Sequence, residues 1–482
     1  MQFNSYIFIM AILPLSVMGY FASNRIHIKL GKICLILFSL LFYMYGNSRN
    51  AFVLLISVFF NLIMAKLISS RKEFRKLLLS IAIAFHVSLL FYYKYINFVI
   101  MNLNEFFHRD FSLYNIILPL GISFITFQQI SYLVMVYKNE IKEIDSLDYF
   151  TYILYFPKIL MGPLVDPLDF INQLNDNGRK RIDYNNIISG IKLFSFGLFK
   201  KVILADTFSN AVLWGFDNVE KASSLEWLLI MLFYTFEIYF DFSGYSDMAV
   251  GISQMMNITL PINFNSPYKA ISIRDFWDRW HITLTKFLTK YIYIPLGGNR
   301  KGRIRTYINI LIVFLISGIW HGANWTFILW GVIYGALCVC GRIFERPFEK
   351  LVESVRWMGT FLVVNLLWLL FRAESISQWW HILGRIFTFQ SMDISDDLIN
   401  CFSLPEADFL IDFLHLEMLN QSMRGMWVFI FAVGAFLLCM IPENNYKKMQ
   451  NNGMLITFFA AIAFVWSFIC LSSESVFVYF SF

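Results

Sequence analysis

Two histidines lie in the parts of this sequence whose residue types could carry out chemistry. His281 belongs to the run RDFWDRWHITLTKFLTKYIYIPLGGNR, residues 274–300, and His321 belongs to SGIWHGANW, residues 317–325. The unperturbed pKa of imidazole, about 6.5, lies close to neutral pH, and burial favours the uncharged ring. A neutral imidazole can accept the proton of a hydroxyl group, so both segments are candidates for general-base chemistry.

The rest of the chain has the composition of a membrane protein. Hydrophobic residues make up 58% of the 482 residues and charged residues only 15%, which is too apolar for a soluble globular protein. A spanning helix needs about 20 mostly apolar residues. Continuous apolar runs therefore predict an all-α, multi-pass integral membrane helical bundle with about ten to twelve crossings, plus re-entrant or interfacial helices. The candidate windows are residues 4–22, 31–46, 50–70, 77–100, 115–137, 148–165, 186–205, 225–252, 306–339, 356–371, 424–442 and 454–480. We expect residues 1–482 to form a single transmembrane domain.

Basic residues predict which ends of these helices face the cytoplasm. They gather after the first window, after the third window and before the ninth window. Loops rich in Lys and Arg stay on the cytoplasmic side, so these three places should be cytoplasmic. We therefore expect a multi-pass protein of the cytoplasmic, or inner, cell membrane. The residues concerned are Arg25, Lys29, Lys32, Arg71, Lys72, Arg75, Lys76, Arg300, Lys301, Arg303 and Arg305.

His321 is expected to lie deep in the membrane. It follows Arg305 by sixteen residues, which at the helical rise corresponds to about 24 Å of a hydrocarbon core about 30 Å thick. Gly322, Ala323 and Asn324 come next and favour a local opening of the helix, where irregular backbone could line a cavity. A single buried histidine is more often structural than catalytic. The residues alone leave both interpretations open.

Residues 274–290 predict an amphipathic helix near the cytoplasmic interface. On one helix, Arg274 would pair with Asp278 and Asp275 with Arg279, because each pair is four residues apart. Trp277 and other apolar residues would form the opposite face. An interfacial helix explains these charges well, but it explains His281 and the following YIPLGG break less well.

Besides the segments of His281 and His321, the apolar run 225–252 also contains ionisable residues that are expected at membrane depth. Glu237, Asp241 and Asp247 accompany the small residues Ser243 to Ser246, which favour a helix break or the close approach of a neighbour. Ionisable groups in lipid face the bundle interior and find partners. We interpret this segment as a kinked or re-entrant helix whose carboxylates pair with Arg or Lys of the next segment.

Several classes of chemistry lack their sequence signatures. The chain has no GxxxxGKS or GxxxxGKT phosphate loop and no GxGxxG, GxSxG or HExxH motif. The basic residues do not form a nucleic-acid surface with exposed aromatics, so no nucleic-acid partner is expected. Six cysteines without metal-site spacing are assigned to packing, namely Cys34, Cys338, Cys340, Cys401, Cys439 and Cys470.

Ordered blocks along the chain add a family resemblance. They are LPLGISFITFQQISYLVMVY from Leu118, FPKILMGPLV from Phe156, GLFKKVILAD from Gly197, IYFDFSGYSDMAVGI from Ile238, FNSPYKA from Phe264 and LLWLLFRAES from Leu366. Together with the two histidine segments, they resemble the membrane-bound O-acyltransferase (MBOAT) family, and within it the bacterial alginate O-acetylation membrane proteins. The resemblance covers residues 1–375 and extends more loosely over the remainder. One departure is that relatives commonly carry Arg-Asp where this chain has Thr289 and Lys290.

The resemblance implies an O-acyltransferase whose two funnels, one from each side of the membrane, meet near a catalytic histidine. His321 matches the family histidine and would act as general base, and His281 matches a second, less strictly required position. The donor would be acetyl-CoA or another cytoplasmic acyl thioester, and no bound cofactor or metal would be needed. Donors of hydrogen bonds to the oxyanion are not identified, and His281, Asn324 or a backbone N–H at Gly322 are candidates. Arg300, Lys301, Arg303 and Arg305 could attract the phosphates of coenzyme A, although they could equally be a topology signal alone.

The implied function is O-acetylation of a cell-surface or extracellular polysaccharide. The acceptor could be an exopolysaccharide such as alginate or cellulose, peptidoglycan, or a serine of an intermediate protein. The acetyl group could also pass to a separate extracytoplasmic acetyltransferase as partner, and membrane lipid surrounds the chain. One alternative is D-alanyl transfer to teichoic acid from a carrier protein. Another is a non-enzymatic channel or transporter, which would tolerate the loss of His321.

Overall fold

The protein is a bundle of helices. The computed structural model describes residues 1–45, 48–389, 391–404, 417–441, 453–471 and 477, and these residues contain no β-strand. Within them, six helical segments are long and apolar enough to cross a membrane: Phe8–Ile26, Asn50–Ser70, Lys72–Phe107, Arg303–His321, Trp325–Ile343 and Glu353–Arg372. Three shorter apolar helices are Ile122–Tyr137, Gly425–Met440 and Met454–Ile469. The predicted all-α, multi-pass membrane bundle is thereby confirmed. The end of the predicted window 454–480 lies outside the described residues.

The helices differ widely in length. The α-helices are α1 (Leu13–Ile26), α2 (Ile28–Met44), α3 (Ser48–Ser70), α4 (Arg75–Leu90), α5 (Ile96–Phe107), α6 (Ile122–Tyr137), α7 (Ser146–Leu154), α8 (Phe156–Ile159), α9 (Pro167–Asn175), α10 (Tyr184–Phe199), α11 (Asp206–Asp217), α12 (Ser224–Met255), α13 (Ile273–Arg279), α14 (Ile282–Leu288), α15 (Arg303–His321), α16 (Trp325–Ile343), α17 (Glu345–Glu349), α18 (Glu353–Arg372), α19 (Ile376–Thr388), α20 (Asp396–Asn400), α22 (Glu417–Met440) and α24 (Met454–Ile469). Short π-helical segments continue several of them: η1 (Phe8–Ile12), η3 (Phe91–Tyr95), η5 (Lys200–Ala205) and η7 (Thr289–Tyr293). Three 3₁₀ turns are η2 (Lys72–Phe74), η4 (Asn177–Lys180) and η6 (Pro267–Lys269).

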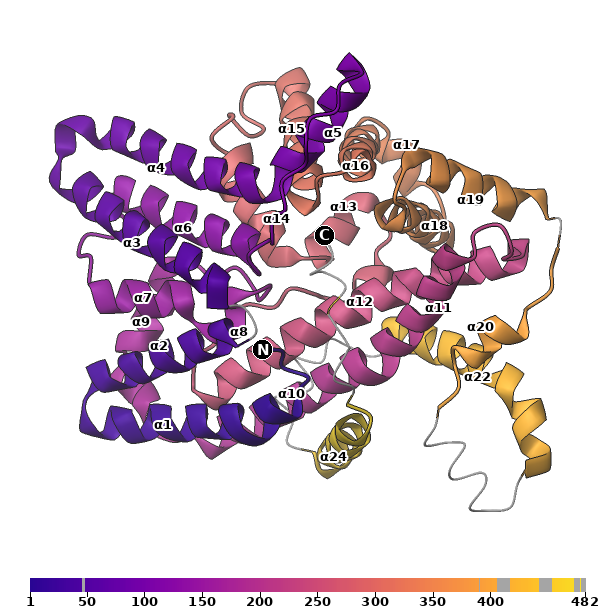
Figure 1. Ribbon diagram of the computed structural model, residues 1–482, viewed down its shortest axis with the longest axis horizontal. Helices are drawn as coiled ribbons and strands as arrows, with labels where there is room; N and C mark the ends of the chain where they lie inside the picture. Colours follow the sequence, from indigo (N-terminus) through magenta and orange to yellow (C-terminus); the bar gives the residue numbers. More distant parts are fainter. Residues whose placement is uncertain (46–47, 390, 405–416, 442–452, 472–476, 478–482) are drawn as a thin grey trace.

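Helix α12 crosses the middle of the molecule. Figure 1 shows α1 to α4 and α6 to α9 toward the left of the view, and α15, α16, α18 and α19 toward its top and upper right. Helices α10 and α11 pack along α12 itself. The two groups of helices, which come from distant parts of the sequence, also contact each other directly, because Phe124 and Phe127 of α6 pack against Trp320 of α15.

Helix α12 is continuous over 32 residues, so the predicted kink or re-entrant turn is wrong. The sequence also indicates a second role for the small residues, the close approach of a neighbouring helix, and this is the role that they have. A Cβ atom added at Gly244 would lie 2.8 Å from the carbonyl oxygen of Gly197 on α10, and one added at Gly197 would lie 2.7 Å from the carbonyl oxygen of Gly244. The two helices thus touch backbone to backbone.

The carboxylates of α12 pair with lysines of the preceding segment. Lys201 Nζ lies 2.7 Å from Asp241 Oδ1, and Lys200 Nζ lies 2.7 Å from Asp247 Oδ2. The predicted pairing with lysine is confirmed for these two acids, but the predicted direction along the chain is wrong. The reason is that α10, η5 and α11 run beside α12 in the opposite direction. Glu237 is buried and forms no ion pair with any described residue.

The close contact between α12 and α10 at Gly244 gives a first testable prediction. Gly244→Ala should destabilise the protein by about 1–3 kcal/mol, because its new methyl group overlaps the α10 backbone. The matched control is Gly341→Ala on α16, where an added Cβ meets no atom within 4 Å and alanine should be neutral or slightly stabilising. Thermal unfolding of the detergent-solubilised proteins measures both. Equal transition temperatures for the two variants would contradict the close contact.

Candidate active site

His321 lies at the tip of a helical hairpin. The predicted single crossing 306–339 is wrong, because α15 ends at His321 and α16 begins at Trp325, with residues 322–324 as the turn between them. Asn324 caps α16 by accepting a hydrogen bond from Thr326 N (3.0 Å), and its Nδ2 donates to the carbonyl oxygen of Glu374 (2.8 Å). Its amide therefore stabilises the turn, which leaves little reason to assign it to an oxyanion.

The imidazole of His321 is buried among aromatic rings beside a small cavity. Its ring centroid lies 5.0 Å from that of Trp320 and 5.2 Å from those of Trp330 and Phe371. The cavity has a volume of about 50 Å³, and His321 shares its lining with Lys94, Trp320 and Phe124. The remaining lining residues are Leu118, Pro119, Leu120, Gly121, Ile122, Ser123, Leu160 and Met161. His321 is thus held firmly, with little space in front of it.

His281 occupies a sharp turn between two short helices. The predicted continuous helix over 274–290 is wrong, because α13 ends at Arg279 and α14 begins at Ile282, and His281 between them has a left-handed backbone with φ of 44°. Asn263 holds this turn: its carbonyl oxygen accepts from Ile282 N at 3.0 Å, and its Oδ1 lies 3.4 Å from His281 Nδ1. The break directs the histidine, 1% exposed, into the protein interior.

The neighbours of His281 in α13 confirm part of the predicted pattern. Arg279 pairs with Asp275 at 2.7 Å as expected, whereas the expected pair between Arg274 and Asp278 is not formed. Trp277 is buried against Trp330 and Tyr334. The apolar face of this segment therefore packs against protein, where the sequence predicts an interfacial helix facing lipid.

Trp320 brings the two histidines together. Its ring centroid lies 6.3 Å from that of His281 and 5.0 Å from that of His321, although the histidines are forty residues apart in sequence. The same indole stacks on Phe127 at 5.3 Å and meets Phe124 edge-on at 5.2 Å. We call Phe124, Phe127 and Trp320 the aromatic partition.

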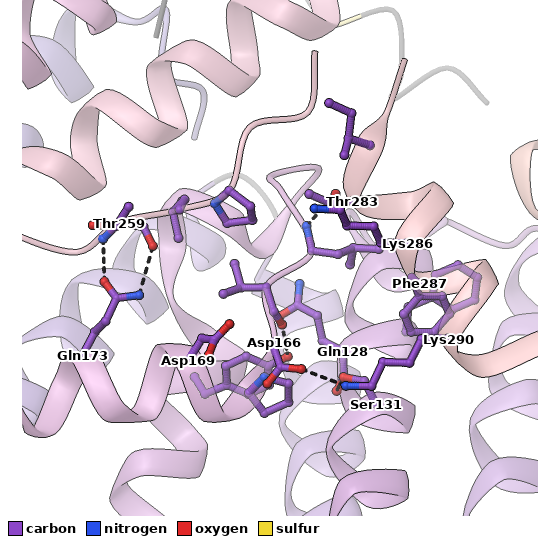
Figure 2. A pocket seen from close by; sticks show the side chains of 18 of the residues that line it. Gln128, Ser131, Asp166, Asp169, Gln173, Thr259, Thr283, Lys286, Phe287 and Lys290 are labelled. Carbon is purple, nitrogen blue, oxygen red and sulfur yellow. Dashed lines mark hydrogen bonds and ion pairs between the residues drawn. The ribbon is translucent and has the colours of Figure 1, made fainter. Parts of the chain in front are cut away.

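A second, much larger cavity lies on the other side of the aromatic partition. It has a volume of about 890 Å³ and is lined by Phe127, by residues of α14 and η7, and by residues of the segments around α9 and after α12. Figure 2 shows Lys286, Lys290 and Asp166 at its wall. Phe127 lines this cavity, whereas Phe124 and Trp320 line the small one. Because Phe127 stacks on Trp320, the walls of the two cavities touch through these two rings.

Lys290 and Asp166 form an ion pair at the wall of the large cavity. Lys290 Nζ lies 2.9 Å from Asp166 Oδ2, as the dashed line in Figure 2 shows. Burial by itself would lower the pKa of Lys290, but the hydrogen bond and negative charge of Asp166 raise this pKa above its ordinary value. Lys290 is one of the positions at which the sequence departs from the pattern of the family that it resembles. Asp166 is the N-cap residue of α9, so the acid that pairs with Lys290 comes from a segment distant in sequence.

The basic cluster of Arg300, Lys301, Arg303 and Arg305 lies in and just after the turn between η7 and α15. All four side chains are exposed, and none of them lines either cavity. Their predicted role in attracting coenzyme A phosphates stays a prediction. The basic residues that do line the large cavity are Arg179, Lys286 and Lys290.

Sequence reasoning overlooks two lysines near the site. Lys94 lies in η3 and lines the small cavity beside His321. Lys158 in α8 is fully buried, hydrogen-bonds to Gln128 and lies 3.9 Å from the centroid of the Tyr152 ring. Both sit inside predicted apolar windows, and an ionisable residue within such a run is the signal that could have found them.

The arrangement supports transfer of a small group to a hydroxyl. A buried imidazole faces a cavity that also contains a lysine, and a separate cavity large enough for an extended donor ends one aromatic layer away. A positioned base and a nearby cation are the parts that acyl transfer requires. Among the described residues, no three His, Cys, Asp or Glu side chains gather as a possible metal site.

Comparison with known proteins points the same way. The family described as MBOAT, membrane-bound O-acyltransferase family, matches residues 71–375. A peptidoglycan O-acetyltransferase of Helicobacter pylori is 36% identical over 100% of this chain and 97% of its own length. The probable alginate O-acetylase AlgI of Pseudomonas aeruginosa is 34% identical over 82% of this chain and 76% of its own. A teichoic acid D-alanyltransferase of Bacillus subtilis is 29% identical over 52% of this chain and 66% of its own.

Proposed function

Because the chain belongs to the membrane-bound O-acyltransferase family, we propose that this enzyme takes an acetyl group from a cytoplasmic thioester and transfers it to a polysaccharide hydroxyl. The observation that carries the proposal is the pair of cavities that meet at the aromatic partition. The large cavity suits the long thioester donor, and the small one, at about 50 Å³, suits an acetyl group and one hydroxyl. The basic loop before α15 is predicted to be cytoplasmic, so we expect the thioester to enter from the side of the membrane where α15 begins.

In this reaction His321 first accepts a proton and later gives it back. The acceptor hydroxyl gives its proton to the imidazole as its oxygen bonds to the acetyl carbon, and the carbonyl electron pair moves onto oxygen. When this intermediate collapses, the carbon–sulfur bond breaks and the imidazolium returns the proton to the leaving thiolate. The products are an acetyl ester and a free thiol, so no metal or redox partner is needed for the balance. Positioned acid–base catalysis of this kind contributes about 10²- to 10⁴-fold in rate.

Acetyl is favoured over D-alanyl as the transferred group. The two O-acetylating relatives align with 100% and 82% of this chain, and the D-alanyl-transferring one with 52%. The small cavity also contains the side chain of Lys94, whose ammonium group would repel the ammonium group of a D-alanyl ester. A non-enzymatic transporter is not retained, because the family is one of acyltransferases.

Peptidoglycan is the acceptor that we favour, since the relative that spans the whole chain is named for it. An alginate-like polysaccharide is the second candidate, supported by the relative named as a probable alginate O-acetylase. The location would be the cytoplasmic membrane, with the acceptor outside. A separate extracytoplasmic acetyltransferase could receive the acetyl group before the glycan does.

Reconstitution in lipid vesicles tests the donor and the acyl group. With radiolabelled acetyl-CoA and peptidoglycan fragments, we expect thiol release together with base-labile label on the fragments. If label leaves the thioester only when an extracytoplasmic transferase is added, the acetyl group passes through that partner. Turnover with a D-alanyl carrier protein, and none with acetyl-CoA, would contradict the proposal.

Donor binding gives a second prediction. Lys286→Gln should raise the KM for acetyl-CoA about fivefold with little change in kcat, because a solvent-exposed charge contributes about 1 kcal/mol to binding a phosphate. The effect should shrink at high ionic strength. The matched variant Arg303→Gln removes an exposed charge of the basic cluster outside the cavity. A larger KM change for Arg303→Gln would place the phosphates at the basic cluster instead.

A further inference from the structure

The end of α15 is held by side chains from a distant π-helical segment. Tyr95 Oη donates a hydrogen bond to the carbonyl oxygen of Ile319 (2.7 Å), and Lys94 Nζ donates to the carbonyl oxygens of Trp320 (2.8 Å) and His321 (2.7 Å). The last carbonyls of an α-helix have no partner within the helix. Two consecutive residues of η3 therefore satisfy three consecutive carbonyls at the catalytic end of α15.

Lys94 combines this anchoring role with a charge in the small cavity. Its ammonium group forms no ion pair with any carboxylate among the described residues, so its charge is not neutralised by an acid. A cation is favoured at a helix C-terminus, where the carbonyls carry partial negative charge. An ammonium group has three N–H donors, and two of them bind the carbonyls of Trp320 and His321. Lys94 and His321 both line the cavity of about 50 Å³, so one N–H remains for what binds there.

We propose that Lys94 is a further residue of the acyl-transfer reaction, which fixes the backbone of His321 and stabilises the carbonyl oxygen of the acetyl group as it becomes negative. The proposal rests on the proposed function and deepens it by naming the group that stabilises the oxyanion. The electron pair that leaves the carbonyl double bond lies on that oxygen in the intermediate and returns on collapse. Lys94 keeps its proton throughout.

Two of the other candidate donors, Asn324 and His281, are less well placed. The amide of Asn324 is used by the hairpin turn, and His281 lies against Trp320 and lines neither cavity. π-Helical segments such as η3 occur frequently at functional sites. Lys94 and Tyr95 of η3 reach neighbouring carbonyls of the same helix end.

Substitutions of Lys94 test the proposal in reconstituted vesicles, with acetyl-CoA as donor and peptidoglycan fragments as acceptor. Lys94→Met should lower kcat about 10²- to 10³-fold, the loss typical of one missing oxyanion donor, with the KM for acetyl-CoA nearly unchanged. Lys94→Arg, which keeps the charge, should retain more activity than Lys94→Met. Lys76→Met is the matched control, since Lys76 is an exposed lysine at the start of the same helical segment. It should behave as wild type.

Chemical rescue separates a role in the reaction from a role in folding alone. In Lys94→Ala, added ethylammonium should restore kcat in a saturable manner, because it can occupy the space of the missing side chain and supply the charge. The proposal is overturned if Lys94→Met keeps kcat within threefold of wild type, or if folded Lys94→Ala gains no activity from ethylammonium. Failure of wild type to release thiol from acetyl-CoA, both with and without an added extracytoplasmic transferase, would instead overturn the proposed function, and this inference with it.

Discussion

Replacing His321 by alanine is expected to abolish O-acetylation of the cell-envelope polysaccharide while the protein remains folded in the membrane. The physical reason is the loss of the group that takes the hydroxyl proton, which costs about 10²- to 10⁴-fold in rate. The imidazole is buried at the hairpin tip beside the small cavity. Removing it enlarges that cavity without leaving a buried charge, so folding should survive. The measurement is base-released acetate from purified polysaccharide at matched amounts of membrane protein.

Two other histidines serve as controls for that experiment. His381 is largely exposed and pairs with Glu220 at 3.1 Å, so His381→Ala should leave acetate release unchanged. His86 is buried and its ring lies 2.8 Å from the side-chain oxygen of Asn61. His86→Ala should therefore lower thermal stability, but the protein that remains folded should still release acetate. Normal acetate content in cells that carry only His321→Ala would return His321 to a structural role.

Breaking the ion pair between Lys201 and Asp241 should destabilise the protein by about 3–5 kcal/mol, the typical loss when one partner of a buried pair is removed. Both side chains are 1% exposed, and Lys201 also lies 2.8 Å from Asp206. Lys201→Met leaves the carboxylate of Asp241 buried beside an apolar side chain. We expect little folded protein in the membrane, and a lowered midpoint of chemical unfolding for what remains.

The double variant Lys201→Met with Asp241→Leu distinguishes charge from packing. It removes both buried charges, so much of the lost stability should return. The control is Glu220→Gln, which breaks an exposed contact with Arg385 and should change stability by less than about 1 kcal/mol. Equal losses for the single and double variants would show that packing, and not the unpaired charge, sets the stability here.

The sequence by itself determined the class of the protein, and it singled out His321 as the candidate catalytic residue. Lipid cannot satisfy exposed backbone groups, so long apolar runs have to become helices, and this local rule holds wherever such a run occurs. The depth predicted for His321 rests on the fixed rise of a straight helix per residue, and α15 is continuous from Arg303 to His321. The ordered motifs then indicated the family.

The tertiary structure alone decided which groups meet at the site. The window around residues 77–100 predicts a helix, but it does not show that Lys94 faces a helix end 227 residues away. The turn at His281 was also hidden, because it is held by Asn263 from another segment. Likewise, the lysine partners of α12 come from the segment that runs back along it. Hydropathy is a property of each segment, whereas hydrogen bonds and ion pairs between segments depend on how the helices pack, and that packing is not encoded in any one window.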